Sequence, residues 1–153
     1  MIRKLLFPTY ITNNLTSLIL LVFRIFFGSL FLWHGLTKWG NLEVLLTTGF
    51  PDPIGVGVEA SIYLAIFGEV VCSLGLIFGV LTRLATLPMI TTMSVAFFIV
   101  HQGDAFSHRE LAFIYLFIFL FFLITGAGKY SVDHWIGNKI DHKRKSRRVT
   151  SKF

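Results

Sequence analysis

The chain has 153 residues, one domain by length, and is far more apolar than an average soluble protein. Hydrophobic residues make up 54% and charged residues 14%, and the apolar residues fall into four runs. This composition excludes an ordinary soluble domain and predicts an all-α, polytopic membrane protein, a bundle of four transmembrane helices. The formal charge of +6 is concentrated in the C-terminal tail, which indicates contact with a membrane surface and argues against nucleic acid as a partner.

Three segments are predicted along the chain. Residues 1–14 form a short basic lead, residues 15–136 the four-helix transmembrane domain, and residues 137–153 a basic tail. The first apolar run, Leu15–Gly35, is too long for the core of a signal peptide, so we expect it to be retained as a helix. The stretch from Asn138 onwards carries seven Lys/Arg and one acid, and we expect it to bind anionic lipids without contributing to the fold.

The first helix combines an apolar sequence with two cations. Arg24, Phe31 and Lys38 are seven residues apart, so they lie on one stripe of a helix, and Gly28 and Gly35 lie beside them. A cation at the centre of a membrane helix costs roughly 2.5–3.5 kcal/mol on insertion scales. This stripe is therefore expected to face protein or water, either as a structural link between helices or as part of a site.

A loop rich in glycine and proline, Leu36–Ala60, precedes the second helix, which is predicted from about Val58 to Val80. Glu69 lies within this second span. Small residues recur at helical spacing beside it and predict a close helix contact: Ala65, Gly68, Cys72, Gly75 and Gly79. Because Cys72 is the single cysteine, an internal disulfide is excluded, and we interpret Cys72 as a packing residue.

The third and fourth helices follow a tight turn at Arg83. They are predicted at about Leu84–Val100 and Glu110–Thr125, with a polar loop between them and a glycine turn after the fourth helix. Basic residues at both termini and in the Arg83 turn, against an acidic first loop, predict that both termini are cytoplasmic.

Relative depths follow from this topology. Arg24 and Glu69 each lie near the centre of their own run, so we predict that they form a buried pair. Arg83 and Asp133 are predicted to pair at the inner surface. At about 1.5 Å per residue, Lys38 lies about 21 Å further out than Arg24.

Several polar residues are expected to gather at the outer end: His34, Lys38, His101, His108, Arg109 and Glu110. His101 and His108 could simply cap helix ends in water. A metal site formed by His34, His101 and Glu110 is conceivable from the ligand types, but no HxxxH or HExxH spacing supports it, and no metal is predicted.

The order and spacing of these elements resemble the DoxX family of small bacterial membrane proteins. The resemblance runs through nearly all of residues 18–135, with Ala127 at a position where the family often has proline. It is carried by Arg24, Gly28, His34-Gly35-x-x-Lys38, Glu69, Gly79, Thr82-Arg83, Glu110-Leu111-Ala112 and the sequence GAGKYSVD at residues 126–133. The resemblance implies a four-helix bundle in the bacterial inner membrane and an association with redox chemistry. A related branch, DoxD, is linked to thiosulfate oxidation with electrons passed to quinone.

Two functions are compatible with these features. The first is a redox-associated subunit that binds quinone or a small sulfur oxyanion through Arg24, His34, Lys38 and Glu110, while Glu69 or His101 handles protons. Because no motif for a covalent cofactor is present, electrons would have to pass through bound quinone or a partner redox subunit. The second is a non-enzymatic assembly partner or small-molecule permease with a structural Arg24–Glu69 pair. Whether the chain is an enzyme is left open by the sequence.

Overall fold

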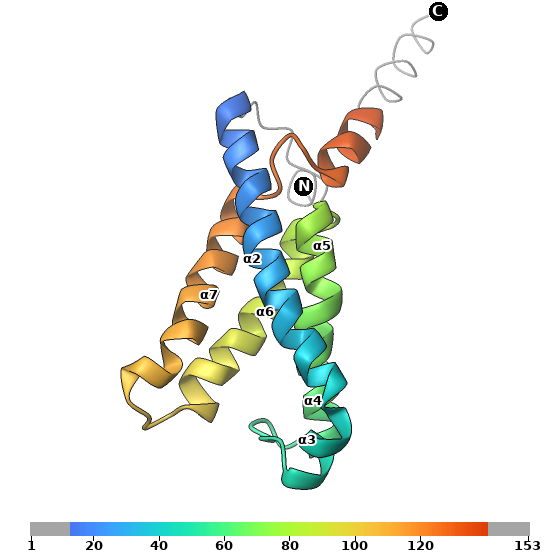
Figure 1. Cartoon of the computed structure of the whole chain (residues 1–153). Helices are drawn as coiled ribbons and strands as arrows, with labels where there is room; N and C mark the ends of the chain where they lie inside the picture. The colour runs from blue at the N-terminus through green and yellow to red at the C-terminus, as the bar shows by residue number, and fades with distance from the viewer. Residues whose placement is uncertain (1–12, 141–153) are drawn as a thin grey trace, which may run out of the picture.

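The computed structural model describes residues 13–140, which form a bundle of helices (Figure 1). The elements are α2 (Asn14–Gly40), α3 (Leu42–Thr48), α4 (Val58–Ile66), η1 (Phe67–Val71), α5 (Cys72–Phe78), α6 (Thr82–Val95), η2 (Ala96–Val100) and α7 (Phe106–Thr125), followed by helical residues 132–140. Four continuous helices are long and apolar enough to cross a membrane: Asn14–Gly40, Val58–Phe78, Thr82–Val100 and Phe106–Thr125. The predicted all-α class with four spanning helices is confirmed.

The boundaries differ from the predicted ones in three places. The first helix continues to Gly40, the predicted loop contains the short helix α3, and α7 begins at Phe106, four residues before Glu110. The first difference has a packing reason, because the added turn of α2 carries Lys38 against η1. The predictions for the basic lead and for most of the basic tail concern residues outside the described range.

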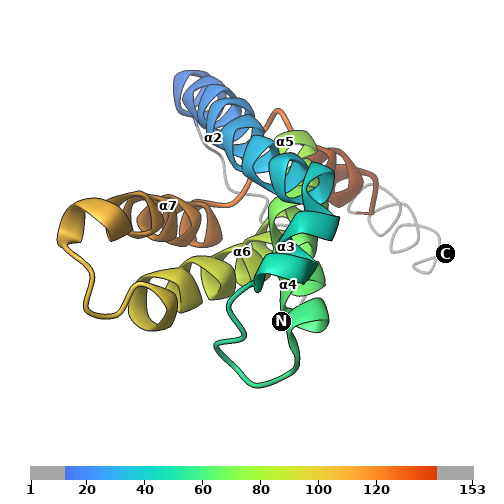
Figure 2. The ribbon, with the colours of Figure 1, turned by 60° about the horizontal axis from the view of Figure 1, so that its bottom comes forward.

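The helices are arranged as two legs that meet at one end. The first leg is α2 with α4, η1 and α5, and the second leg is α6 and η2 with α7. Figure 1 shows the legs converging at its top, where the connection after α7 also lies, and diverging toward α3 at its bottom; the rotated view in Figure 2 shows the same divergence. We call these two ends of the bundle the Arg24 end and the α3 end.

Glycines set the register within the first leg. A Cβ atom on Gly28 would lie 2.6 Å from Ile77 Cγ1, and one on Gly35 would lie 2.8 Å from Glu69 Cβ. A larger residue at either position would collide with these atoms. The backbone of α2 therefore packs directly against side chains of the second spanning helix at both points. Because they run antiparallel, Gly35 is level with Glu69 and Arg24 is level with the end of α5.

Gly79 ends α5 and begins the turn into α6. It adopts a left-handed conformation (φ 69°), with Val80 N–H donating to Gly75 O at 2.8 Å and Gly79 N–H donating to Leu76 O. These two bonds form a Schellman motif, in which glycine avoids the cost of a Cβ. A Cβ at Gly79 would also collide with the guanidinium of Arg24, at 2.7 Å from Nη1. The turn and the packing of Arg24 thus depend on the same glycine.

Aromatic rings connect the legs between their two ends. Phe31 of α2 contacts Tyr115 and Phe119 of α7, with ring centroids 5.1 and 4.7 Å apart. All three side chains are nearly fully buried. Below this contact, toward α3, the legs separate and leave room for a site.

Candidate functional site

Arg24 anchors the end at which the helices converge. Its side chain is 1% exposed, and its guanidinium donates to the carbonyl of Ala127, to Tyr130 O at 2.8 Å and to Ile77 O at 3.5 Å. Ile77 belongs to the last turn of α5, where the carbonyls lack partners within the helix and the dipole favours a cation. Arg24 therefore links three chain segments: α2, the end of α5 and the connection after α7.

Asp133 completes this anchor from the first turn of helical residues 132–140. Its carboxylate accepts the N–H groups of Leu81 (2.7 Å) and Thr82 (2.9 Å), and its own N–H donates to Gly79 O at 2.9 Å. Leu81 has a φ of 47°, which a bulky residue rarely adopts, and the two bonds to Asp133 hold it there. Asp133 thus caps the start of α6.

Both predicted charge pairs are wrong. Arg24 does not pair with Glu69, because Gly79, beside Arg24, lies ten residues from Glu69, or about 15 Å along the helix. The prediction assumed that the centre of each apolar run lies at one depth, whereas the glycine contacts shift α2 along its partner. Within residues 13–140 no ion pair joins Arg83 to Asp133; the guanidinium of Arg83 donates to Ile124 O at 2.8 Å.

Glu69 pairs with Lys38 instead. Lys38 Nζ lies 2.6 Å from Oε1 and 2.5 Å from Oε2 of Glu69, and the two side chains are 28% and 3% exposed. Lys38 is on the last turn of α2, and its side chain points back toward the start of that helix, as helical side chains do. This direction brings the ammonium to the level of Gly35 and Glu69, so the chain places a buried carboxylate and a half-buried cation together.

The backbone around Glu69 is a π-helix. The stretch η1, Phe67–Val71, interrupts the second spanning helix at its middle, and η2, Ala96–Val100, ends the third. Wide π turns occur mostly as local insertions in α-helices and are frequent at functional sites. Here η1 carries the buried carboxylate, and η2 leads directly to His101.

A groove of about 940 Å³ runs between the second and third spanning helices. Its volume is in the range of pockets that hold small molecules. Its polar lining residues are at the α3 end and near the middle: Lys38, Ser61, Glu69, Thr91, Thr92 and His101. Toward the Arg24 end the lining is apolar: Gly75, Val80, Leu81, Leu84, Ala85 and Leu87. The groove is therefore mainly apolar, and its few polar side chains are confined to one half of its length.

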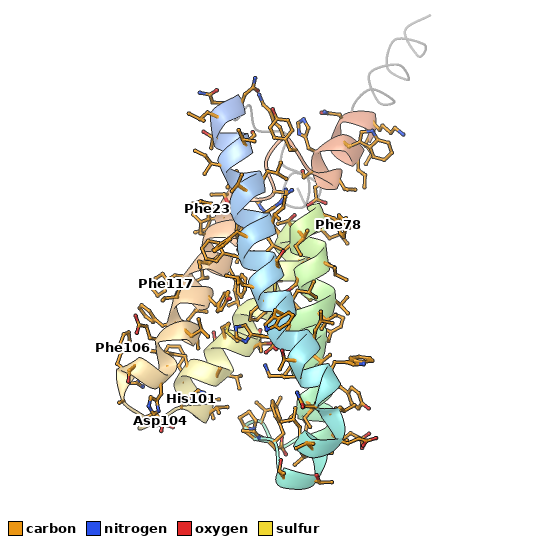
Figure 3. The ribbon with its side chains drawn as sticks, viewed as in Figure 1. Phe23, Phe78, His101, Asp104, Phe106 and Phe117 are labelled. Atoms are coloured by element: carbon orange, nitrogen blue, oxygen red, sulfur yellow. The ribbon has the colours of Figure 1, made fainter. Side chains whose placement is uncertain are left out.

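The other predicted site residues are spread over the α3 end. His101 lines the groove and lies 2.9 Å from Asp104, with its Nδ1 toward the carboxylate (Figure 3). His34 is exposed, does not line the groove, and contacts the edge of the Tyr115 ring at 6.1 Å between centroids. Glu110 is exposed. Of the predicted set, only Lys38, Glu69 and His101 come together along the groove.

The alternative metal site does not assemble. No group of three or more His, Cys, Asp or Glu side chains with metal-binding geometry occurs in the part of the chain that is described.

Several residues that line the groove were not predicted from the sequence, above all Thr92 and four of the residues 50–54. Thr92 is placed beside Gly68, where a Cβ would lie 2.7 Å from its Oγ1, and a single threonine in an apolar run gives no signal of such a contact.

Comparisons with known proteins agree with this architecture. The DoxX family model matches residues 19–102, more than half of the chain. One Haemophilus influenzae protein is 31% identical over 121 residues, which covers 74% of this chain and 80% of that protein. A second protein of this organism is 30% identical over 118 residues, covering 72% and 85%, and both are described only as uncharacterized proteins.

No solved structure matches the chain. The family match contains Arg24, Lys38, Glu69 and His101, and it ends in the loop between η2 and α7. Together with the four spanning helices, these findings identify the chain as a multi-pass membrane protein of the DoxX family.

Proposed function

We propose that this protein is a redox-associated membrane subunit that binds a lipid-soluble quinone in the groove, with the quinone head beside Lys38 and Glu69. The observation that carries the proposal is a mainly apolar groove in which the half-buried ammonium of Lys38 pairs with the buried carboxylate of Glu69. Quinones combine a small head, which has two carbonyl acceptors and no net charge, with an apolar tail. The apolar half of the groove, toward Leu81 and Leu84, suits the tail.

The pair has hydrogen-bonding capacity for such a head. Lys38 has three N–H donors. Two of them are used in the hydrogen bonds to Oε1 and Oε2 of Glu69, so the third is available to a quinone carbonyl. Glu69 can accept a hydrogen bond from a hydroxyl of the reduced form. Electrons would come from a partner redox subunit, since the sequence has no motif for a covalent cofactor.

The depth of the pair favours a quinone over a phospholipid. Glu69 is one residue from residue 68, the midpoint of the Val58–Phe78 span. A charged headgroup at this depth carries the cost of an ion in the bilayer interior, whereas a neutral head does not. A small sulfur oxyanion is less well matched, because Arg24 is occupied by carbonyls and the charge of Lys38 is balanced by Glu69.

The test is whether quinone can be extracted from the protein purified from its membrane. We expect bound quinone in the native chain and a drop of roughly tenfold or more in the variant Lys38→Met/Glu69→Met, since tenfold corresponds to about 1.4 kcal/mol. This double variant removes both charges together and so avoids stranding one of them. Glu59→Met, at an exposed position outside the groove lining, is the control and should retain quinone. A native protein without quinone, or a double variant that keeps it, would contradict the proposal.

The orientation of the bundle is a second part of this proposal. Arg83 lies at the Arg24 end, while Glu43, Asp52, Glu59 and Asp104 lie at the α3 end. By the positive-inside rule the Arg24 end faces the cytoplasm, which is consistent with a protein of the bacterial inner membrane. Anionic lipids would then contact the basic tail.

Reporter fusions test this orientation. A reporter inserted at Asp52 should report the outer side, and one fused to the C-terminus should report the cytoplasm. If both reporters were found on one side of the membrane, the assignment of four spans with both termini inside would be wrong.

A further inference from the structure

The segment that connects α3 to α4 covers the groove at the α3 end. Four of its residues, Phe50, Pro51, Pro53 and Ile54, line the groove, and we call residues 50–54 the roof segment. In Figures 1 and 2 this connection projects from the first leg toward the space below α6. The groove thus carries an apolar cover where the legs diverge.

Asp52 fastens the roof segment to the start of α4. Its carboxylate accepts the N–H of Val56 at 3.0 Å, the N–H of Gly57 at 2.8 Å and the hydroxyl of Ser61 at 2.8 Å. We call these three bonds the Asp52 clasp. Asp52 itself does not line the groove, although four of its close neighbours and its partner Ser61 do. The clasp therefore fixes the position of the roof segment through Asp52, which lies outside the groove lining, and Ser61, which belongs to it.

The clasp is in place at neutral pH. The hydrogen bond from Ser61 makes the largest contribution to lowering the pKa of Asp52, and the bond from Gly57 follows. A group with a lowered pKa stabilises the folded form above its usual pKa, and this stabilisation is lost as the pH falls through the lowered value. The roof segment is accordingly held throughout the physiological range.

On the side between the second and third spanning helices, residues 13–140 provide no such cover for the groove. Both rims consist of exposed apolar side chains, with Leu64 54% and Phe67 47% exposed on one rim and Leu84 50% and Leu87 47% exposed on the other. In a membrane-spanning bundle, side chains of this kind face lipid tails. Within residues 13–140, the groove is therefore open toward the bilayer between these rims.

We infer that the roof segment, held by Asp52, closes the groove to the water at the α3 end and that ligands enter from the bilayer, between the second and third spanning helices. The inference rests on the proposed function only in taking the groove as the binding site. It makes the roof segment a determinant of specificity, because water-borne ions are excluded whereas uncharged lipophilic molecules are admitted. The ligand class is thereby narrowed to lipophilic molecules, since a free oxyanion would have to pass the roof segment.

The native chain contains a suitable reporter. Cys72 is its single cysteine and lines the groove three residues beyond Glu69, about 16 Å from Ser61 along the helix. Full-length protein in lipid nanodiscs would be treated with two maleimides, one with an alkyl chain and one with a sulfonate. Each labelling rate is divided by the rate of that reagent with a small thiol in solution. Both reagents attack the same sulfur, so their ratio reports access and not thiol reactivity.

In the native chain we expect the sulfonated reagent to label Cys72 at least roughly tenfold more slowly than the alkyl reagent, the ratio that 1.4 kcal/mol produces. Asp52→Ala, which removes the clasp, should raise the rate of the sulfonated reagent by a similar factor and leave the alkyl rate nearly unchanged. Glu59→Ala is the matched control, because it removes an exposed acid from the first turn of α4 without affecting the clasp. Ser61→Ala, which removes one of the three bonds, should give a smaller increase and serves if Asp52→Ala does not fold.

Two results would overturn the inference. One is a native chain that both reagents label equally fast. The other is a variant without the clasp that behaves as Glu59→Ala does. Neither result depends on quinone, so a failure of the roof inference can be told from a failure of the proposed function, which is measured by extraction from the native chain.

Discussion

Replacing Arg24 with leucine is expected to destabilise the bundle strongly. The guanidinium donates to the carbonyls of Ala127, Tyr130 and Ile77, and leucine would leave these buried acceptors without their donor. Hydrogen bonds to a charged group contribute roughly 1.5–3 kcal/mol each, so the loss of the two closest bonds predicts about 3 kcal/mol or more. For a chain of this length, that corresponds to a decrease in Tm of about 6–12 °C.

Thermal unfolding in detergent measures this loss, and two further variants show its origin. Arg24→Lys keeps the charge but presents a compact ammonium that cannot reach three carbonyls at once, so an intermediate decrease is expected. Arg109→Leu is the control, because that guanidinium lies over the Phe97 ring at 5.1 Å and contributes only a cation–π contact. If Arg24→Leu and Arg109→Leu lowered the Tm equally, the hydrogen bonds of Arg24 to the three carbonyls would contribute no more to stability than one cation–π contact.

The sequence predicted the buried position of Arg24 but assigned it the wrong partner. The heptad spacing of Arg24, Phe31 and Lys38 correctly predicted a stripe that faces protein, since the stripe residues Arg24 and Phe31 are buried. Periodicity reports which face of a helix is buried, and here that information was sufficient. It does not report how far one helix is shifted along its neighbour.

The shift along the helix axis depends on contacts that a single sequence does not pair. Gly28 and Gly35 were recognised as small residues, but their partners Ile77 and Glu69 could not be assigned without the fold. Equal depth was assumed from the centres of the two apolar runs, which misplaced Arg24 by about 15 Å relative to Glu69. The cation that meets Glu69 is Lys38, fourteen residues further along α2 than Arg24.

The candidate site was predictable in its residue types and only partly in its position. Lys38, Glu69 and His101 were identified because ionisable residues in or beside apolar runs are expensive and so mark sites. The groove itself was not predicted, because it results from the divergence of the legs and from the roof segment. That segment was recognised only as a turn rich in proline and glycine, the pattern that Pro51, Pro53 and Gly55 give.

The second large expected effect concerns Lys38 and Glu69. Glu69→Met alone leaves an ammonium without its partner, and Lys38→Met alone leaves a carboxylate that is 3% exposed without a counterion. Breaking one side of a buried pair costs roughly 3–5 kcal/mol in soluble proteins, and snorkelling of Lys38 toward the α3 end reduces the first of these losses. We therefore expect Lys38→Met to be the more destabilising single change.

The double variant should recover much of this loss, because two methionines of similar volume remove both charges from the groove. A buried pair replaced by apolar residues is often neutral in stability or better. The two changes should therefore be strongly non-additive in the free energy of unfolding, as expected for residues in contact. Arg24→Leu combined with Glu69→Met should instead be additive, since those side chains lie about 15 Å apart along the bundle.

The two double-mutant cycles, measured by unfolding in the same detergent, decide between two partners for one carboxylate. Coupling of Glu69 with Lys38 and additivity with Arg24 would place the charge pair in the groove and leave Arg24 with its carbonyl partners. Coupling with Arg24 would require a different register of α2, one in which Gly28 and Gly35 no longer meet Ile77 and Glu69. The charged pair could bind a ligand without stabilising the ligand-free bundle. If Lys38→Met/Glu69→Met is as stable as the native chain but has lost quinone, the pair is needed for binding and not for folding.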